Sequence, residues 1–183
     1  MIDLTEEIVK SLRASPVVLG ALVAGLDDEL IRWRPGPGEW AVIEVVAHVA
    51  DVDERAHARL RRMLAEDNPF LPAFDQDALA VERGYIGMDL PEQVARYRNS
   101  RAAHLADLAQ LDRHQWQRTG HHEAAGDMTV QLYEAHVASE DVDHLRLSHA
   151  ADRQGGHRRT GMDGAKAPGL DRGGAMSDHK LAV

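Results

Sequence analysis

The sequence predicts an all-α protein, a four-helix bundle, from its composition, its apolar spacing and its helix breakers. Aromatic residues make up only 4% of the 183 residues although 44% are hydrophobic, so the core must consist mainly of Leu, Val, Ile and Ala. This composition favours helices over a β-sandwich or barrel, which use more aromatic and β-branched residues. Four segments carry apolar residues at helical spacing, and stretches rich in Pro and Gly separate them.

The first predicted helix covers residues 3–26. Asp3 can serve as its N-cap, and Glu6 three residues later can complete a capping box. Pro16 lies inside this segment and is expected to kink or divide it, because proline cannot donate a helical hydrogen bond. Residues 34–40, RPGPGEW, then form a rigid break before the next helix.

Two further helices are predicted at residues 41–66 and 91–111. The inward stripe of the first includes His48 between apolar neighbours, and Pro91 suits the first turn of the second. The connection between them, residues 68–90, is longer than a tight helix–helix turn. We therefore expect it to cross over the bundle or to cover a site.

The fourth helix is predicted from Thr129, its N-cap, to about residue 151, after a polar loop at 118–127. From residue 153 onward glycine recurs and large apolar residues nearly vanish. Such a segment buries too little apolar surface to offset its ordering entropy. The predicted organisation is therefore a bundle at 1–152 and a disordered tail at 153–183.

The charge of the chain bears on its partners. A net charge of −9 repels phosphate backbones, so nucleic acid is not an expected partner. The basic cluster of Arg59, Arg61 and Arg62 lies among acidic neighbours and is interpreted as a solvated helix face. The expected partner is a small-molecule substrate, with a homodimer left open.

The chain contains no cysteine, which excludes disulfides, thiolate metal ligands and a cysteine nucleophile. Its acidic N-terminus does not resemble a signal peptide. No apolar stretch approaches the ~20 residues that a membrane helix needs. We therefore expect a cytoplasmic protein without a membrane partner.

Histidines and a glutamate provide the candidate metal ligands. In the last predicted helix His136, Glu140 and His144 recur at spacings of four, so neighbouring members can converge on one point. His48 can supply a third ligand from a facing helix. Mixed imidazole and carboxylate ligands suit Zn, Ni, Fe(II) or Mn better than Ca or Mg.

Each candidate also has a simpler interpretation. His48 on an apolar face can be a core residue with its hydrogen bonds satisfied, and the stripe containing Glu140 can face solvent. His57 and His114 are placed at exposed positions and are not considered ligands.

Three stretches resemble the DinB family of helical-bundle metalloproteins, including its bacillithiol-dependent S-transferase branch. They are EWAVIEVVAHVADV (39–52), AEDNPFLPAFDQDALA (65–80) and MTVQLYEAHVASEDVDHL (128–145). The resemblance covers roughly residues 3–150. It implies a four-helix bundle that holds one divalent metal ion.

The resemblance also implies a ligand set. The family triad has one His from the second helix and two, spaced by four, from the fourth, which places ligands at His48, Glu140 and His144. Most relatives have His where this chain has Glu140, and His136 is the reserve ligand. The carboxylate lowers the net charge of a divalent site from +2 to +1, which makes a bound water less acidic.

Among relatives the metal is thought to activate a low-molecular-weight thiol for transfer to an electrophile. By this resemblance Arg101 is a candidate anchor for a substrate carboxylate, and the simpler interpretation is a residue at the rim of the core. His121 and His122 are candidates for the mouth of the site, and the simpler interpretation is that they are solvated loop residues.

These observations leave three hypotheses for the function of the protein. The first is a metal-dependent enzyme, a thiol S-transferase or a hydrolase. The second is a non-catalytic metal- or ligand-binding bundle, and the third is a structural bundle without metal.

Overall fold

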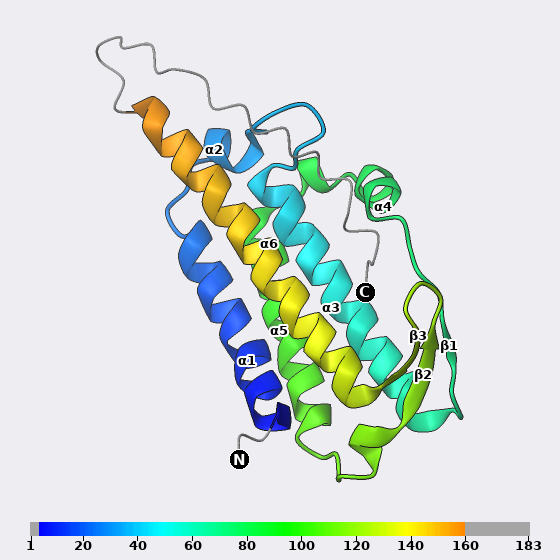
Figure 1. Cartoon of the computed structure of the whole chain (residues 1–183). Helices are drawn as coiled ribbons and strands as arrows, with labels where there is room; N and C mark the ends of the chain where they lie inside the picture. The colour runs from blue at the N-terminus through cyan, green and yellow to red at the C-terminus, as the bar shows by residue number, and fades with distance from the viewer. Residues whose placement is uncertain (1–3, 160–183) are drawn as a thin grey trace, which may run out of the picture.

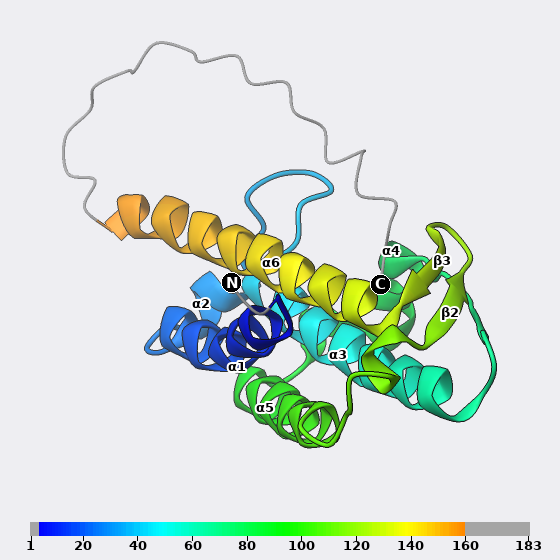
Figure 2. The same ribbon diagram turned by 60° about the horizontal axis from the view of Figure 1, so that its bottom comes forward.

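Four long helices form the body of the protein (Figure 1). The computed structural model describes the backbone of residues 4–159 and the side chains of residues 4–145. The long helices are α1 (Leu4–Val23), α3 (Val42–Ala65), α5 (Leu90–Leu108) and α6 (Val130–Arg159). Helices α1 and α3 each pack against both α5 and α6, as Figure 2 shows from the end of the bundle. All four contribute side chains to one buried apolar cluster. The predicted four-helix bundle is confirmed.

Helix α3 is the most enclosed of the four. It begins where the Glu44 carboxylate accepts a hydrogen bond of 2.9 Å from the Ala41 N–H, and the Arg34 guanidinium pairs with the same carboxylate. Its bounds lie within one residue of the predicted 41–66. Because α5, α6 and the following connection all cover it, even polar residues such as His48 and Asp53 are buried.

Helix α1 continues through Pro16 and is not divided there. Because proline has no backbone N–H, the carbonyl of Leu12, four residues earlier, lacks its helical partner. The Arg101 guanidinium takes that place, and its Nη1 donates to the Leu12 oxygen at 3.0 Å. A side chain from α5 therefore satisfies the carbonyl that the proline leaves. Asp3, the predicted cap, lies outside the described residues.

The connection between α3 and α5 is more ordered than the sequence suggested. It contains strand β1 (Phe70–Leu71), helix α4 (Gln76–Arg83) and the 3-10 turn η1 (Tyr85–Gly87). The Tyr85 hydroxyl donates to the Asp51 carboxylate of α3 at 2.5 Å. This contact attaches the connection to α3.

The prediction of a loop at 118–127 was wrong, because these residues form most of a β-hairpin. Strand β2 (Thr119–His122) pairs antiparallel with β3 (Gly126–Thr129) and parallel with β1. Gly126 has a positive φ of 78° in the turn. At Gly120 a Cβ would lie 3.0 Å from both Leu71 and Met63, so a glycine lets the sheet lie close to α3.

The starts of α5 and α6 agree with the sequence, whereas two short helices and the full length of α6 were not predicted. Asp89 caps α5, and the Thr129 hydroxyl accepts from the Leu132 N–H at the start of α6. Short helices α2 (Asp28–Arg32) and η2 (Gln115–Gln117) complete the described elements. Helix α6 extends to Arg159, so residues 153–159 of the predicted tail are helical, and 160–183 lie outside the described part. None of the described helices is long and apolar enough to cross a membrane.

The role of Pro16 can be tested by replacing it with alanine. Pro16→Ala restores a backbone N–H at position 16 that can donate to the Leu12 carbonyl. Proline in a helix interior costs about 3 kcal/mol relative to alanine. Because the Arg101 contact already offsets part of this cost, we expect stabilisation of only about 1–2 kcal/mol in urea unfolding. Destabilisation would contradict this account of α1.

Candidate metal centre

His48 lies in the first half of α3 and is almost completely enclosed, with 1% of its surface exposed. The ring of Trp40 contacts it edge-on, with centroids 4.9 Å apart, and Phe74 from the connection lies 6.4 Å away. The Arg55 guanidinium covers the Phe74 ring at 4.6 Å. His48 is therefore surrounded by aromatic surface.

The ring of His144 reaches His48 from the facing helix. Helices α3 and α6 run in opposite directions in Figure 1, and the two imidazole centroids are 4.8 Å apart with 31° between the ring planes. The His144 Nδ1 lies 2.7 Å from the carbonyl oxygen of Glu140. We assign the ring proton to Nδ1, since a carbonyl only accepts, and this leaves the lone pair of His144 on Nε2.

Electrostatics keep His48 neutral. Burial lowers its pKa to about 3, and the neighbouring His144 acts in the same direction. Its Nδ1 is buried and has no hydrogen-bond partner among the described residues. Buried polar atoms are rarely left unpaired, and a neutral imidazole is the form that binds a metal ion. His48 therefore has the chemical form of a metal ligand.

The third predicted ligand is not assembled with this pair. Glu140 lies one turn before His144 and is partly exposed, and no three His, Asp or Glu side chains in the described range gather to hold a metal ion. His136, the reserve ligand, precedes His144 by two turns, about 12 Å along the helix axis. The structure thus brings together His48 and His144, without a third His, Asp or Glu beside them among the described residues.

Arg101 lies in the interior of the bundle, and its α3 partner Asp53 follows His48 by five residues. Only 1% of its side chain is exposed, and its guanidinium pairs with Asp53 of α3 at 2.6 Å and Asp141 of α6 at 2.6 Å. The carboxylates that it binds are therefore those of the chain itself. Its position is also not the rim of the core, which was the simpler interpretation.

A second buried histidine, which the sequence analysis missed, extends this network. His104 of α5 lies between Asp53, at 3.4 Å, and Glu134 of α6, at 3.1 Å. Burial alone would lower the pKa of His104, but the carboxylates of Glu134 and Asp53 raise it to about 9. His104 is therefore charged where His48 is neutral. The available signal was the recurrence of Asp, Arg and His on inward helix positions.

His57 also belongs to this buried region. The sequence placed it on the surface, but its ring stacks on His104 with centroids 5.1 Å apart, and its Nε2 lies 2.7 Å from Asp107. The neighbouring Arg59 is likewise buried and donates to the Pro72 carbonyl. The basic cluster is therefore not wholly solvated, because α3 is covered on more sides than its periodicity indicated.

The histidines of the hairpin do not line the site. His121 pairs with Asp127 at 2.7 Å, and the strand that holds it lies beside Met63 near the C-terminal end of α3. Met63 is fifteen residues after His48, which is about 22 Å along the helix. The expected placement of His121 and His122 at the mouth of the site was wrong.

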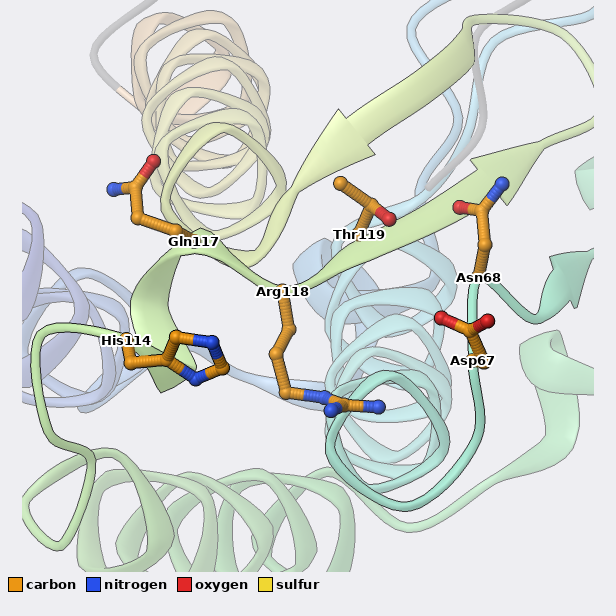
Figure 3. A pocket seen from close by; sticks show the side chains of 6 residues that line it. All are labelled: Asp67, Asn68, His114, Gln117, Arg118 and Thr119. Atoms are coloured by element: carbon orange, nitrogen blue, oxygen red, sulfur yellow. The ribbon is translucent and has the colours of Figure 1, made fainter.

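Two cavities occur at the opposite end of the bundle from the histidine pair. One of about 510 Å³ includes Thr5, Trp116 and Gln131 in its lining. The other measures about 210 Å³, and Figure 3 shows around it the side chains of Asp67, Asn68, His114, Gln117, Arg118 and Thr119. Arg118 already donates to the carbonyls of Met63 and Glu66 at the end of α3. Neither lining therefore competes with the histidine pair as a metal centre.

Comparison with known proteins gives a family match and two solved structures. The model of the DinB superfamily matches residues 11–148. YfiT from Bacillus subtilis, described as a probable metal-dependent hydrolase with an unusual four-helix bundle topology, superposes with a TM-score of 0.78 at 20% identity over 83% of this chain and 87% of YfiT. TT2238, described as a four-helix bundle protein, gives a TM-score of 0.59 at 26% identity over 80% and 98% of the two chains.

Curated relatives match over a shorter stretch. A Geobacillus thermodenitrificans protein named "Putative metal-dependent hydrolase" is 36% identical over 75 residues, which is 41% of this chain and 42% of that protein. A protein of the same description from Oceanobacillus iheyensis is 34% identical over 64 residues, or 35% and 37% of the two chains. The chain thus matches about two fifths of the length of these relatives.

The charged state of His104 predicts how stability depends on pH. The folded pKa of about 9 lies above the ordinary 6.5, so the stabilisation is complete below about pH 6.5 and is lost as pH rises toward 9. The free energy of unfolding should fall by up to about 1.4 kcal/mol per pH unit over this range. Urea unfolding between pH 6 and 10 measures it.

The matched variants are His104→Gln and His114→Gln. The first removes the titrating group and should flatten this pH dependence, while the second changes an exposed histidine and should retain it. An unchanged pH profile in His104→Gln would show that His104 is not protonated in the folded protein.

Proposed function

Because the chain belongs to the DinB superfamily, we propose that it is a metal-dependent hydrolase whose metal ion is held by His48 and His144. One observation carries the proposal: two helices that face each other bring two imidazoles to a centroid distance of 4.8 Å. Glu140, one turn from His144, is proposed as the third ligand. The reaction class is supported by the description of YfiT as "a probable metal-dependent hydrolase" and of the curated relatives as "Putative metal-dependent hydrolase".

The residues present fit a divalent cation. His48 presents a buried ring nitrogen with no partner in the described part of the protein, and its low pKa keeps that ring able to ligate. Two imidazoles and one carboxylate suit Zn, Ni, Fe or Mn, and Zn or Ni are our first candidates. When bound, such an ion supplies a Lewis acid that polarises a carbonyl and activates a nucleophile.

The surrounding residues orient the pair and enclose His48. Trp40 and Phe74 pack around His48, so its ring has little freedom to rotate. Asp51, one turn after His48, holds the connection through Tyr85 and Arg83. The backbone oxygen of Glu140 fixes the ring of His144. These contacts preorganise both imidazoles before any ligand binds.

The nucleophile of the reaction separates two versions of this proposal. Water gives hydrolysis, whereas a small thiol such as bacillithiol gives S-transfer to an electrophile. Because the chain has no cysteine, the thiol must be a co-substrate. A bound divalent cation would support either version, since it stabilises a deprotonated oxygen or sulfur.

The proposal predicts metal-dependent turnover that requires both histidines. Protein reconstituted with Zn or Ni should hydrolyse members of a panel of activated esters and amides, and chelation should abolish this activity. His48→Ala and His144→Ala should each lower kcat/KM by more than about 100-fold, above the 10–100-fold that typically follows loss of an outer partner. The exposed His114→Ala is the matched control and should retain full activity.

Assays with bacillithiol and measurement of bound metal distinguish hydrolysis from S-transfer and from metal binding without catalysis. Turnover only with bacillithiol and an electrophilic acceptor would replace hydrolysis by S-transfer. Stoichiometric metal without turnover in either arm would overturn the enzyme and support a metal-binding bundle.

The identity of the third ligand can be tested with two further variants. Glu140→Gln keeps the size of the side chain and removes its charge, so metal affinity should fall. His136→Gln should leave the affinity unchanged because of its position two turns away. Competition with a chromogenic chelator measures both, and the reverse result would assign the ligand to His136.

A further inference from the structure

The strongest feature outside the histidine pair is the buried contact set of Arg101. Its Nε donates to Asp53 of α3 at 2.6 Å, and its Nη1 donates to Asp141 of α6 at 2.6 Å. Nη1 also donates to the Leu12 carbonyl of α1 at 3.0 Å. One side chain of α5 therefore contacts all three of the other long helices. We call Arg101, Asp53 and Asp141 the arginine clamp.

The clamp lies close to the histidine pair along both helices. Asp141 precedes His144 by three residues and Asp53 follows His48 by five, which correspond to about 4.5 Å and 7.5 Å along the helix axes. A rotation or slide of α6 relative to α3 would thus move the two imidazoles apart. The clamp resists such motion, because a planar guanidinium fixes direction as well as distance.

Asp141 is held more firmly than a single ion pair would hold it. Arg101 donates to both of its carboxylate oxygens, at 2.6 and 3.1 Å, and the Tyr97 hydroxyl donates to one of them at 3.2 Å. The guanidinium also lies 5.1 Å from the Tyr97 ring centroid. Asp141 and His144 lie within one turn of α6. These contacts therefore fix the direction in which the His144 side chain projects from the helix.

We propose that Arg101 is a positioning residue for the metal centre, acting through Asp53 and Asp141 to set the spacing of His48 and His144. This inference rests on the proposed function for its metal readout but not for its geometric one. The hydrogen bonds of Arg101 go to Asp53, Asp141 and Leu12 and not to either imidazole, so its effect is indirect. Its effect on the centre is carried by α3 and α6.

The test uses a charge-balanced variant, because Arg101→Met alone would leave buried carboxylates unpaired and endanger folding. Arg101→Met with Asp53→Asn and Asp141→Asn removes the clamp without leaving net charge. Arg96→Met is the matched control. Arg96 joins α5 to α3 through Asp51 and Glu54, and neither of these partners lies on α6.

Two readouts are needed. In metal-free, isotope-labelled protein, ring protons of His48 and His144 should show a nuclear Overhauser effect in the parent and in Arg96→Met, and lose it in the clamp variant. In Co²⁺-loaded protein the clamp variant should show shifted d–d absorption bands and at least about 10-fold weaker affinity. Arg101→Lys, which keeps the charge without the planar fork, should fall between parent and clamp variant.

The outcomes separate the two proposals. A parent with the Overhauser effect but no bound metal would overturn the metal-dependent function and leave the clamp standing. A folded clamp variant with unchanged Overhauser effect and unchanged Co²⁺ spectrum would overturn the positioning role. Failure of the charge-balanced variant to fold would also overturn it, since Arg101 would then act only in stability.

Discussion

The ion pairs of Arg101 with Asp53 and Asp141 are the constraint on which the rest of this bundle depends. A charge with 1% exposure is tolerated only when it is paired, and removing one partner of such a pair typically costs about 3–5 kcal/mol. The same guanidinium satisfies the carbonyl that Pro16 leaves without a helical partner. One side chain therefore explains why α1 stays continuous and why four helices meet at one level of the core.

The pKa values of two buried histidines are shifted in opposite directions at two levels of the bundle. Near the clamp, His104 lies between two carboxylates and its pKa rises to about 9. Near the upper part of α3, His48 lies among Trp40, Phe74 and His144, and its pKa falls to about 3. The physical cause is the presence or absence of a buried anion beside the ring. The charged residues around His104 join the helices through ion pairs, whereas the neutral ring of His48 offers a nitrogen lone pair.

Much of this arrangement was predictable from the sequence. Apolar periodicity located the four long helices, and α3 was predicted within one residue at each end. His48 was singled out because it interrupts an apolar stripe, and His144 because it lies four residues after Glu140. The structure places their two rings together. Helical spacing carries such information because residues on one face remain on one face.

Other features depend on contacts that spacing does not encode. The hairpin at 119–129 forms because β1, about fifty residues earlier, pairs with it and Gly120 allows close approach to α3. Arg101 looked like a rim residue because its two carboxylate partners come from different helices. The relation of Glu140 to the histidine pair depends on the rotation of α6 about its axis, which a spacing of four leaves undetermined.

The central claim is that His48 and His144 together hold a metal ion, and metal content tests it most directly. Elemental analysis of the purified, tag-free chain beside His48→Ala would measure bound Zn, Ni, Fe and Mn per chain. The account predicts close to one metal ion in the parent and almost none in the variant. An absence of metal from the parent after reconstitution, or equal metal in both proteins, would contradict it.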